Sequence, residues 1–196
     1  MPAACYISEH DSPVKIRILS TALRLFVERG LCETTVRDIA AGAQCTNPAL
    51  FKHFENKDAL ALFLFEQCYR WLYQMVSTAI AVHSGYEQRQ RDLVVRYLDA
   101  LESDSPAVLF APENLRHFWP SVRPAIRRHS IVAAIHKMLE DGQREGVVTR
   151  ALSVRMLAIG WLGTLQQFAR IWYFDRHTGS GSASELHEIL MKIVAI

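Results

Sequence analysis

The sequence has few cysteines and no long apolar run, and these two absences narrow the class of protein. The four cysteines are Cys5, Cys32, Cys45 and Cys68, and they form neither a CxxC pair nor the spacing of a zinc finger. A disulfide framework and a zinc site are therefore not expected. No apolar stretch reaches the ~18 residues of a membrane span, and the N-terminus MPAACYISEHDSP lacks the pattern of a signal peptide. We expect a cytoplasmic protein with no membrane partner.

The sequence also lacks a strong excess of charge of either sign. Its 22 Lys and Arg residues against 20 Asp and Glu residues give a formal net charge of +2, and residues 1–58 hold seven of each kind. Composition alone is therefore neutral about binding to nucleic acid. Half of the residues are hydrophobic and 21% are charged, which is typical of a folded, soluble globular protein.

The motifs of several common enzyme classes are missing as well. The sequence has no nucleophile elbow, no P-loop, no HExxH and no Gly-rich dinucleotide fingerprint. We therefore expect no catalytic residues, no cofactor and no bound metal. An enzyme on a helical bundle stays an alternative, because a buried set of Ser or Cys, His and acid would not be visible in sequence spacing.

Apolar residues repeat at helical spacing along nearly the whole chain, which predicts an all-α protein of about nine helices. Pro13 opens the first helix and Gly30 ends it. The other helices are expected at 35–42, 46–53, 56–83, 87–103, 106–118, 122–145, 153–175 and 183–195. We predict a flexible tail at 1–12, a three-helix module at 13–57, and a helical bundle at 58–196 that the long helix joins to the module.

The two short helices at 35–42 and 46–53 are joined by a turn that permits only a tight crossing. Thr35 caps the first helix, with Asp38 at the position of a capping-box acid. Thr46 caps the second helix, and Pro48 lies in its first turn, where a missing N–H costs little. This pattern predicts a helix-turn-helix unit, whose second helix reads double-stranded operator DNA.

The start of the second short helix is expected to meet base edges. Asn47 is suited to adenine, Lys52 to guanine and Ala49 to a thymine methyl group. Polar groups around them are expected to hold the DNA backbone. The predicted DNA-binding residues are Thr35, Arg37, Thr46, Asn47, Ala49, Phe51, Lys52, His53 and Lys57. Packing within a helical hairpin remains the alternative for this segment.

Residues 14–62 resemble the TetR family of transcriptional regulators. The matching positions are Ile18, Ala22, Leu25, Phe26, Gly30, Thr34, Thr35, Ile39, Ala40, Ala43, Thr46, Leu50, His53, Phe54, Lys57 and Leu60. Phe51 stands where the family usually has Tyr, so a phosphate contact by a hydroxyl is lost and only ring packing remains. Gln44 stands where the family usually has Gly, and a left-handed conformation there would carry a strain of about 1–2 kcal/mol.

The resemblance implies a homodimer that dimerises through its last two long helices, and a repressor that a small, largely apolar effector releases from a pseudo-palindromic operator. Apolar stripes on the helices at 153–175 and 183–195 agree with such a seam. Its predicted residues are Trp161, Leu165, Leu186, Ile189, Leu190 and Ile193. A core within one chain is the alternative.

Aromatic residues are frequent between the long helix and the helix at 153–175. Large apolar groups with a few polar ones are typical of a small-molecule site. The candidates are Phe65, Cys68, Trp71, Phe110, His117, Phe118, Trp119, Trp161, Gln166, Phe168 and Trp172. Packing in the core is the alternative for each. A regulator that senses redox state through Cys45 and Cys68 also stays open, because Cys45 lies next to the cap of the reading helix.

Overall fold

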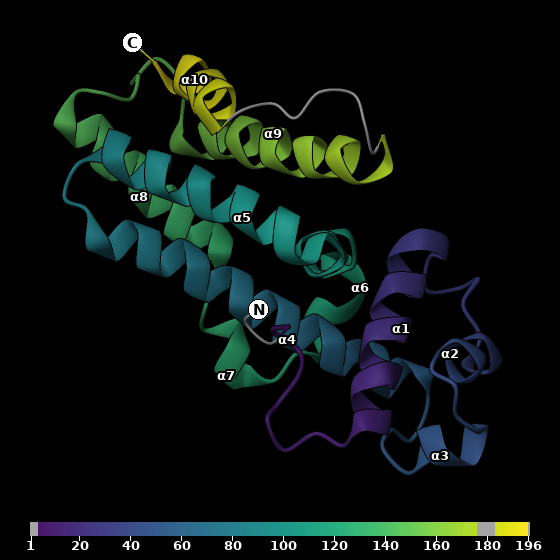
Figure 1. The fold of residues 1–196 in the computed structure, drawn as a ribbon. Coiled ribbons are helices and arrows are strands. Elements are labelled where there is room, and N and C mark those ends of the chain that lie inside the picture. Colours follow the sequence, from purple (N-terminus) through teal and green to yellow (C-terminus); the bar gives the residue numbers. More distant parts are fainter. Residues whose placement is uncertain (1–3, 176–182, 196) are drawn as a thin grey trace. The chain divides into compact units, whose positions relative to one another are not determined.

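The computed structural model describes residues 4–175 and 183–195, and all regular elements in these two ranges are helical. The elements are α1 (Pro13–Arg29), α2 (Val36–Gly42), α3 (Asn47–Phe51), α4 (Lys57–Val82), α5 (Tyr86–Glu113), α6 (Leu115–Phe118), the 3-10 helix η1 (Trp119–Ser121), α7 (Pro124–Arg127), α8 (Ile131–Glu145), α9 (Val154–Phe174) and α10 (Ala183–Val194) (Figure 1). The prediction of an all-α protein with an N-terminal helix-turn-helix is confirmed.

Two stretches differ from the expected helix boundaries. The helices expected at 87–103 and 106–118 both form within α5, where non-helical backbone at Asp104 (φ −155°, ψ 68°) separates them as expected, but the second one ends at Glu113. Proline lacks an N–H and cannot donate to the carbonyl four residues before it, so Pro106 favours the break at this point. The helix expected at 122–145 is divided, because the Ser130 hydroxyl caps the start of α8 by accepting from the Ala133 N–H at 3.1 Å.

The chain folds into two compact units, Met1–Trp71 with Pro106–Arg127, and Leu72–Ser105 with Arg128–Ile196. The border therefore differs from the one we expected after residue 57. The helices α4 and α5 each contribute to both units. The bend at Asp104 lies at the residues where α5 passes from the second unit to the first.

The first unit has an aromatic core built from distant parts of the sequence. Phe26 of α1 stacks on Phe110 at the end of α5, with ring centroids 5.7 Å apart and an interplanar angle of 16°. Phe118 of α6 lies 5.3 Å from Phe65 of α4. All four rings are buried, so residues 106–118 complete the core on which α1 rests.

In the second unit, α9 contacts both α8 and α10. The hydroxyl of Tyr97 on α5 donates to the carbonyl of Leu165 on α9 at 3.0 Å, and burial raises the pKa of Tyr97. The glycine Gly142 of α8 permits close packing, since a Cβ there would lie 2.7 Å from the ring of Tyr86. No helix in the described ranges combines the length and the apolar character needed to cross a membrane.

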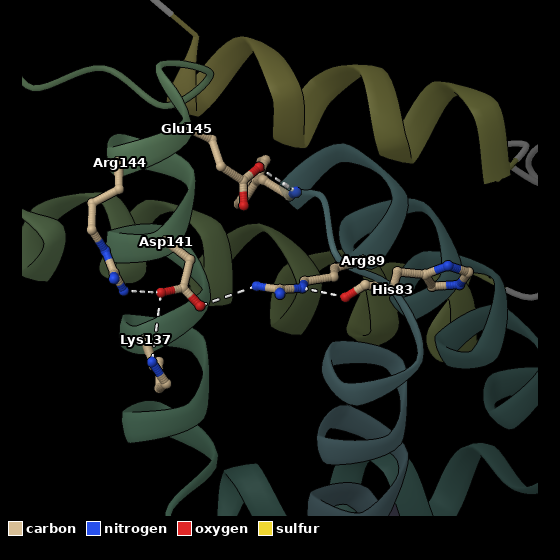
Figure 2. Close-up of polar contacts among 7 residues, drawn as sticks. His83, Arg89, Lys137, Asp141, Arg144 and Glu145 are labelled. Atoms are coloured by element: carbon tan, nitrogen blue, oxygen red, sulfur yellow. Dashed lines mark hydrogen bonds and ion pairs between the residues drawn. The ribbon is translucent and has the colours of Figure 1, made fainter.

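Charged side chains also tie α5 to α8 in the second unit. Figure 2 shows the carboxylate of Asp141 among three cations, with which it forms ion pairs: Arg89 at 3.0 Å, Lys137 at 3.5 Å, and Arg144. Nearby, Glu145 accepts from the Tyr86 N–H at 2.7 Å and so caps the first turn of α5. Acidic side chains near the end of α8 thus bind the backbone N–H and the arginine in the first turn of α5.

Candidate nucleic-acid interface

The turn between α2 and α3 is fixed by local hydrogen bonds. The Thr35 hydroxyl accepts from the Asp38 N–H at 3.2 Å, and the Asp38 carboxylate accepts from the Thr35 N–H at 2.9 Å, which completes the expected capping box. The Thr35 hydroxyl also donates to the Asp38 carboxylate at 2.6 Å, and this bond, followed by the one from the Thr35 N–H, holds the pKa of Asp38 below its usual range. The Thr46 hydroxyl caps α3 by accepting from the Ala49 N–H at 3.3 Å.

Gln44 lies in this turn with φ 52°, in the left-handed region. The strain expected from the sequence is therefore present, at about 1–2 kcal/mol for a residue other than glycine. The neighbouring Cys45 donates its N–H to the carbonyl of Ala40 at 2.9 Å, which closes the turn. This conformation directs the chain into the cap of α3.

The helix α1 supports the turn from behind. A Cβ on Gly42 would lie 2.7 Å from the Thr21 methyl group, so only glycine permits this approach of α2 to α1 without a shift. The Arg17 guanidinium donates through Nε to the carbonyl of Ala43 at 2.9 Å. Ile39 and Leu50 are fully buried beneath the turn. The reading helix is therefore held by packing as well as by its caps.

The third helix, α3, has a buried side and an exposed side. Leu50 is buried, while Phe51 at the end of α3 is 48% exposed, and Lys52 and His53, which directly follow the helix, are exposed as well. Asn47 and Ala49 are half-buried. The remaining candidates Thr35, Arg37 and Thr46 are also exposed. The structure brings these residues together on two adjacent helices and their caps, which is the arrangement that direct reading of base edges requires.

Lys57 differs from the other candidates because its charge is engaged inside the unit. Its ammonium group donates to the carbonyl of Leu31 at 2.6 Å and to the carbonyl of Thr34 at 2.9 Å. An ammonium group has three N–H donors, so at most one is left for a phosphate. Lys57 therefore ties the start of α4 to the segment between α1 and α2.

The N-terminal segment was expected to be a flexible tail, but residues 4–12 are folded in the first unit. Tyr6 is buried, and the Asp11 carboxylate accepts from Lys15 at 2.7 Å and from the Ser8 N–H at 2.8 Å. The bond from Lys15 lowers the pKa of Asp11 most, the bond from the Ser8 N–H lowers it next, and the nearby His53 acts in the same direction. The segment therefore lies close to a candidate DNA contact, which sequence reasoning missed.

The structure divides the predicted dimer residues into two groups. Trp161, Leu165, Leu186 and Leu190 are buried within the chain and have almost no surface to offer a partner. Ile189 is exposed and Ile193 is half-buried. The sequence alone did not single out the large apolar residues that are exposed on α9, which are Met156, Ile159, Ile171 and Phe174.

The predicted effector residues also fall into groups. Phe65, Cys68, Phe110, Phe118 and Trp161 are buried, Trp71, Trp119, Phe168 and Trp172 are half-buried, and His117 and Gln166 are exposed. Seven of the eleven belong to the first unit and four to the second. A shallow, open pocket of about 290 Å³ lies elsewhere in the second unit, and it is lined by Arg89, Asp141, Arg144 and Glu145, whose side chains are drawn in Figure 2. Its polar lining differs from the apolar pocket that we expected.

The geometry of α2, its turn and α3 defines a helix-turn-helix protein. Residues 18–63 match the family described as "Bacterial regulatory proteins, tetR family". This match falls on the segment, residues 14–62, in which the resemblance to that family was found from the sequence.

Three similar proteins illustrate how far the likeness extends. The "Probable acrEF/envCD operon repressor" of Escherichia coli (strain K12) is 35% identical over 80 residues, or 40% of this chain and 36% of that protein. This chain thus spans about a third of that relative's length. The transcriptional activator FasR of Mycolicibacterium smegmatis is 27% identical over 86% of this chain and 77% of its own. The solved structure of KstR2 of Mycobacterium tuberculosis has a TM-score of 0.75 at 23% identity, covering 91% of this chain and 93% of that one, and it shares the fold.

Proposed function

We propose that the protein is a transcriptional repressor that binds a pseudo-palindromic operator as a homodimer and leaves it when a small, largely apolar effector binds. The observation that carries the proposal is the exposure of Phe51, Lys52 and His53 at and just after the end of α3, while Leu50 anchors this helix in the core. A helix held in this way enters the major groove as a rigid body.

Within this interface, the residues have separate roles. Asn47 and Lys52 read base edges, since an amide pairs with adenine and an ammonium group donates to guanine. The ring of Phe51 packs against the DNA without a hydrogen bond. Arg37, His53, Thr35 and Thr46 hold the backbone, the two threonines mainly by fixing the helix starts whose amides face the phosphates.

The homodimer is supported by exposed apolar residues near both ends of α9, with the exposed polar residues Gln167 and Arg170 between them. Met156, Ile159, Ile171 and Phe174 are each more than half exposed, at 56%, 58%, 51% and 55%, and Ile189 of α10 is 50% exposed. Between them lies Gly163, where an added Cβ would meet no atom of the chain within 4 Å. A second copy that packs α9 against α9 would bury these groups, and its two-fold symmetry would match a palindromic site.

The proposed release by an effector requires that effector binding and DNA binding are thermodynamically coupled. Operator DNA and effector must each prefer a different conformation of the dimer, so each weakens the binding of the other by the same factor. The helix α4 starts six residues after α3 ends and continues into the second unit, so it is the segment through which a conformational change would be carried. The repressor relative from Escherichia coli favours repression, and the activator FasR makes activation the alternative outcome.

Selection of genomic fragments by the purified protein tests the proposal. We expect the recovered sites to share two inverted half-sites with centres about 34–36 Å apart. Asn47→Ala should relax the base preference at one position of each half-site. The matched control is Lys137→Ala, which removes an exposed cation of α8 and should leave binding unchanged. Recovery of unrelated, asymmetric fragments would overturn the proposal, and a reporter gene behind a recovered site would separate repression from activation.

A further inference from the structure

A buried polar cluster joins α5, α9 and α10 in the second unit. Gln90 of α5 is fully buried, and its carbonyl Oε1 accepts from the Tyr86 hydroxyl at 2.6 Å and from the Trp161 Nε1–H at 3.2 Å. Its amide Nε2 donates to the backbone carbonyl of His187 on α10 at 3.1 Å and lies 3.2 Å from Nδ1 of the same ring. The amide of Gln90 thus uses two acceptor positions and two donors.

The orientation of the Gln90 amide follows from its partners. The indole N–H of Trp161 is only a donor, so the atom that faces it must be the carbonyl oxygen. The backbone carbonyl of His187 is only an acceptor, so the atom that faces it must be the nitrogen. Exchanging the two atoms would place a donor against a donor and an acceptor against an acceptor.

The same reasoning fixes the protonation of His187. Because Nε2 of Gln90 is a donor, Nδ1 of His187 has to accept, which requires a neutral ring with its proton on Nε2. A proton on Nδ1 would point at the N–H of Gln90 and break the bond. The side chain is only 9% exposed, so little water is available to replace the lost partner.

The charges around the ring come from α5. Glu87 lies 4.0 Å from Nε2 of His187, and Arg91 in turn forms an ion pair with Glu87 at 3.3 Å. On α10, Glu188 pairs with Lys192 at 2.7 Å, and the contribution of α9 to the cluster, Trp161, does not titrate. Burial lowers the pKa of His187 most, the charge of Arg91 lowers it further, and Glu87 opposes them.

We propose that His187 is a pH-sensitive latch that holds α10 on α5 while its ring is neutral and releases α10 when the ring is protonated. A lowered folded-state pKa means that the released state binds the proton more readily than the docked state. The docked state is therefore fully stabilised above the ordinary pKa of about 6.5 and loses stability as the pH falls below that value, until the folded-state pKa is passed. This inference concerns the folded chain and does not depend on DNA or effector binding.

Two measurements on the full-length protein test the latch. Nitrogen NMR of the histidine rings should show His187 neutral at pH 7, with its proton on Nε2. Hydrogen exchange, corrected for the intrinsic pH dependence, should show the protection of α10 amides falling by up to about tenfold per pH unit below pH 6.5. A ring that is charged at pH 7, or that carries its proton on Nδ1, would overturn the proposal.

Substitutions separate the latch from a general effect of acid. His187→Asn keeps an acceptor near the position of Nδ1 but does not titrate, so the protection of α10 should become independent of pH between 7.5 and 5.5. The control His129→Asn removes an exposed histidine of the same unit and should keep the wild-type dependence. Equal loss of protection on acidification in the wild type and in His187→Asn would show that another group is responsible. If His187→Asn does not fold, the NMR titration of the wild type still decides the question.

Discussion

Glu66 holds Arg123 by both its backbone and its side chain. The carboxylate accepts from the Arg123 N–H at 2.9 Å and from its Nε at 2.6 Å, and Glu66 is only 4% exposed. Removing one partner of such a pair leaves a buried charge without compensation. The contact therefore fixes the segment after η1 to α4 within the first unit.

We expect Arg123→Ala to lower the free energy of unfolding by about 1–3 kcal/mol, because a hydrogen bond to a charged group is lost while the backbone N–H of residue 123 still reaches Glu66. Glu66→Ala should cost more, because it removes both bonds and leaves a cavity. Denaturation with urea measures both changes. Arg116→Ala is the control, since this exposed arginine should change stability by less than about 0.5 kcal/mol, and equal effects of Arg116→Ala and Arg123→Ala would contradict the assignment.

The two lysines near the reading helix should behave differently. Lys52→Ala should weaken DNA binding and reduce the slope of log affinity against log salt by about 1, as the loss of one phosphate or base contact requires. Lys57→Ala should leave that slope nearly unchanged and instead lower stability by about 1–3 kcal/mol, because the carbonyls of Leu31 and Thr34 lose a charged donor. Binding titrations at several salt concentrations, paired with urea denaturation, distinguish the two roles. A reduced salt slope for Lys57→Ala at normal stability would restore it as a phosphate contact.

Replacing the strained residue of the turn should stabilise the protein. In Gln44→Gly the left-handed strain is relieved, and part of the gain is offset by the greater entropy of glycine in the unfolded chain, so we expect about 0.5–1 kcal/mol. Ala41→Gly is the matched control on the preceding helix and should destabilise by about 1 kcal/mol. Thermal unfolding of both variants provides the measurement. Destabilisation by both glycines would show that the side chain of Gln44 makes a compensating contact.

Charges placed on α9 and α10 should separate assembly from folding. Ile159→Glu should yield a folded monomer, because residue 159 is 58% exposed in one chain and lies on the proposed dimer face. Leu190→Glu should instead unfold the second unit at a cost of several kcal/mol, since residue 190 is fully buried. Sedimentation and circular dichroism report the two outcomes. Val95→Glu, on an exposed site of α5, is the control that should leave both dimer and fold intact, and a dimeric Ile159→Glu variant would exclude this face.

The parts of the molecule that depend on local sequence were predictable, and those that depend on distant contacts were not. Thr35 and Thr46 act on amides three residues away, so their caps could be inferred from spacing. The acceptors of Lys57 lie 23 and 26 residues away, and nothing local indicates that the fold brings them to its ammonium group. The resemblance to the family indicated that Lys57 is a site residue, but it gave no information about the hydrogen bonds of its ammonium group.

The buried and exposed sides of α9 could not be predicted from the sequence for a different reason. This helix is apolar on nearly every side, so a periodic stripe does not identify which side meets the chain's own core. The structure places Trp161 inside, beside Gln90, and leaves Ile159 outside. Choosing between them requires the positions of α5 and α10, which periodicity within one helix does not contain.

The first unit is assembled from two separate stretches of chain, and this limits how the molecule can be recombined with other proteins. A chimaera that transfers only residues 1–71 as the DNA-binding part would leave Phe26 without its stacking partner Phe110, and Glu66 without Arg123. A folded chimaera also needs residues 106–127 of this chain, which have to be joined to the other protein at both of their ends. Exchange of operator specificity between relatives is therefore simpler by substitution on α3 than by swapping the whole N-terminal segment.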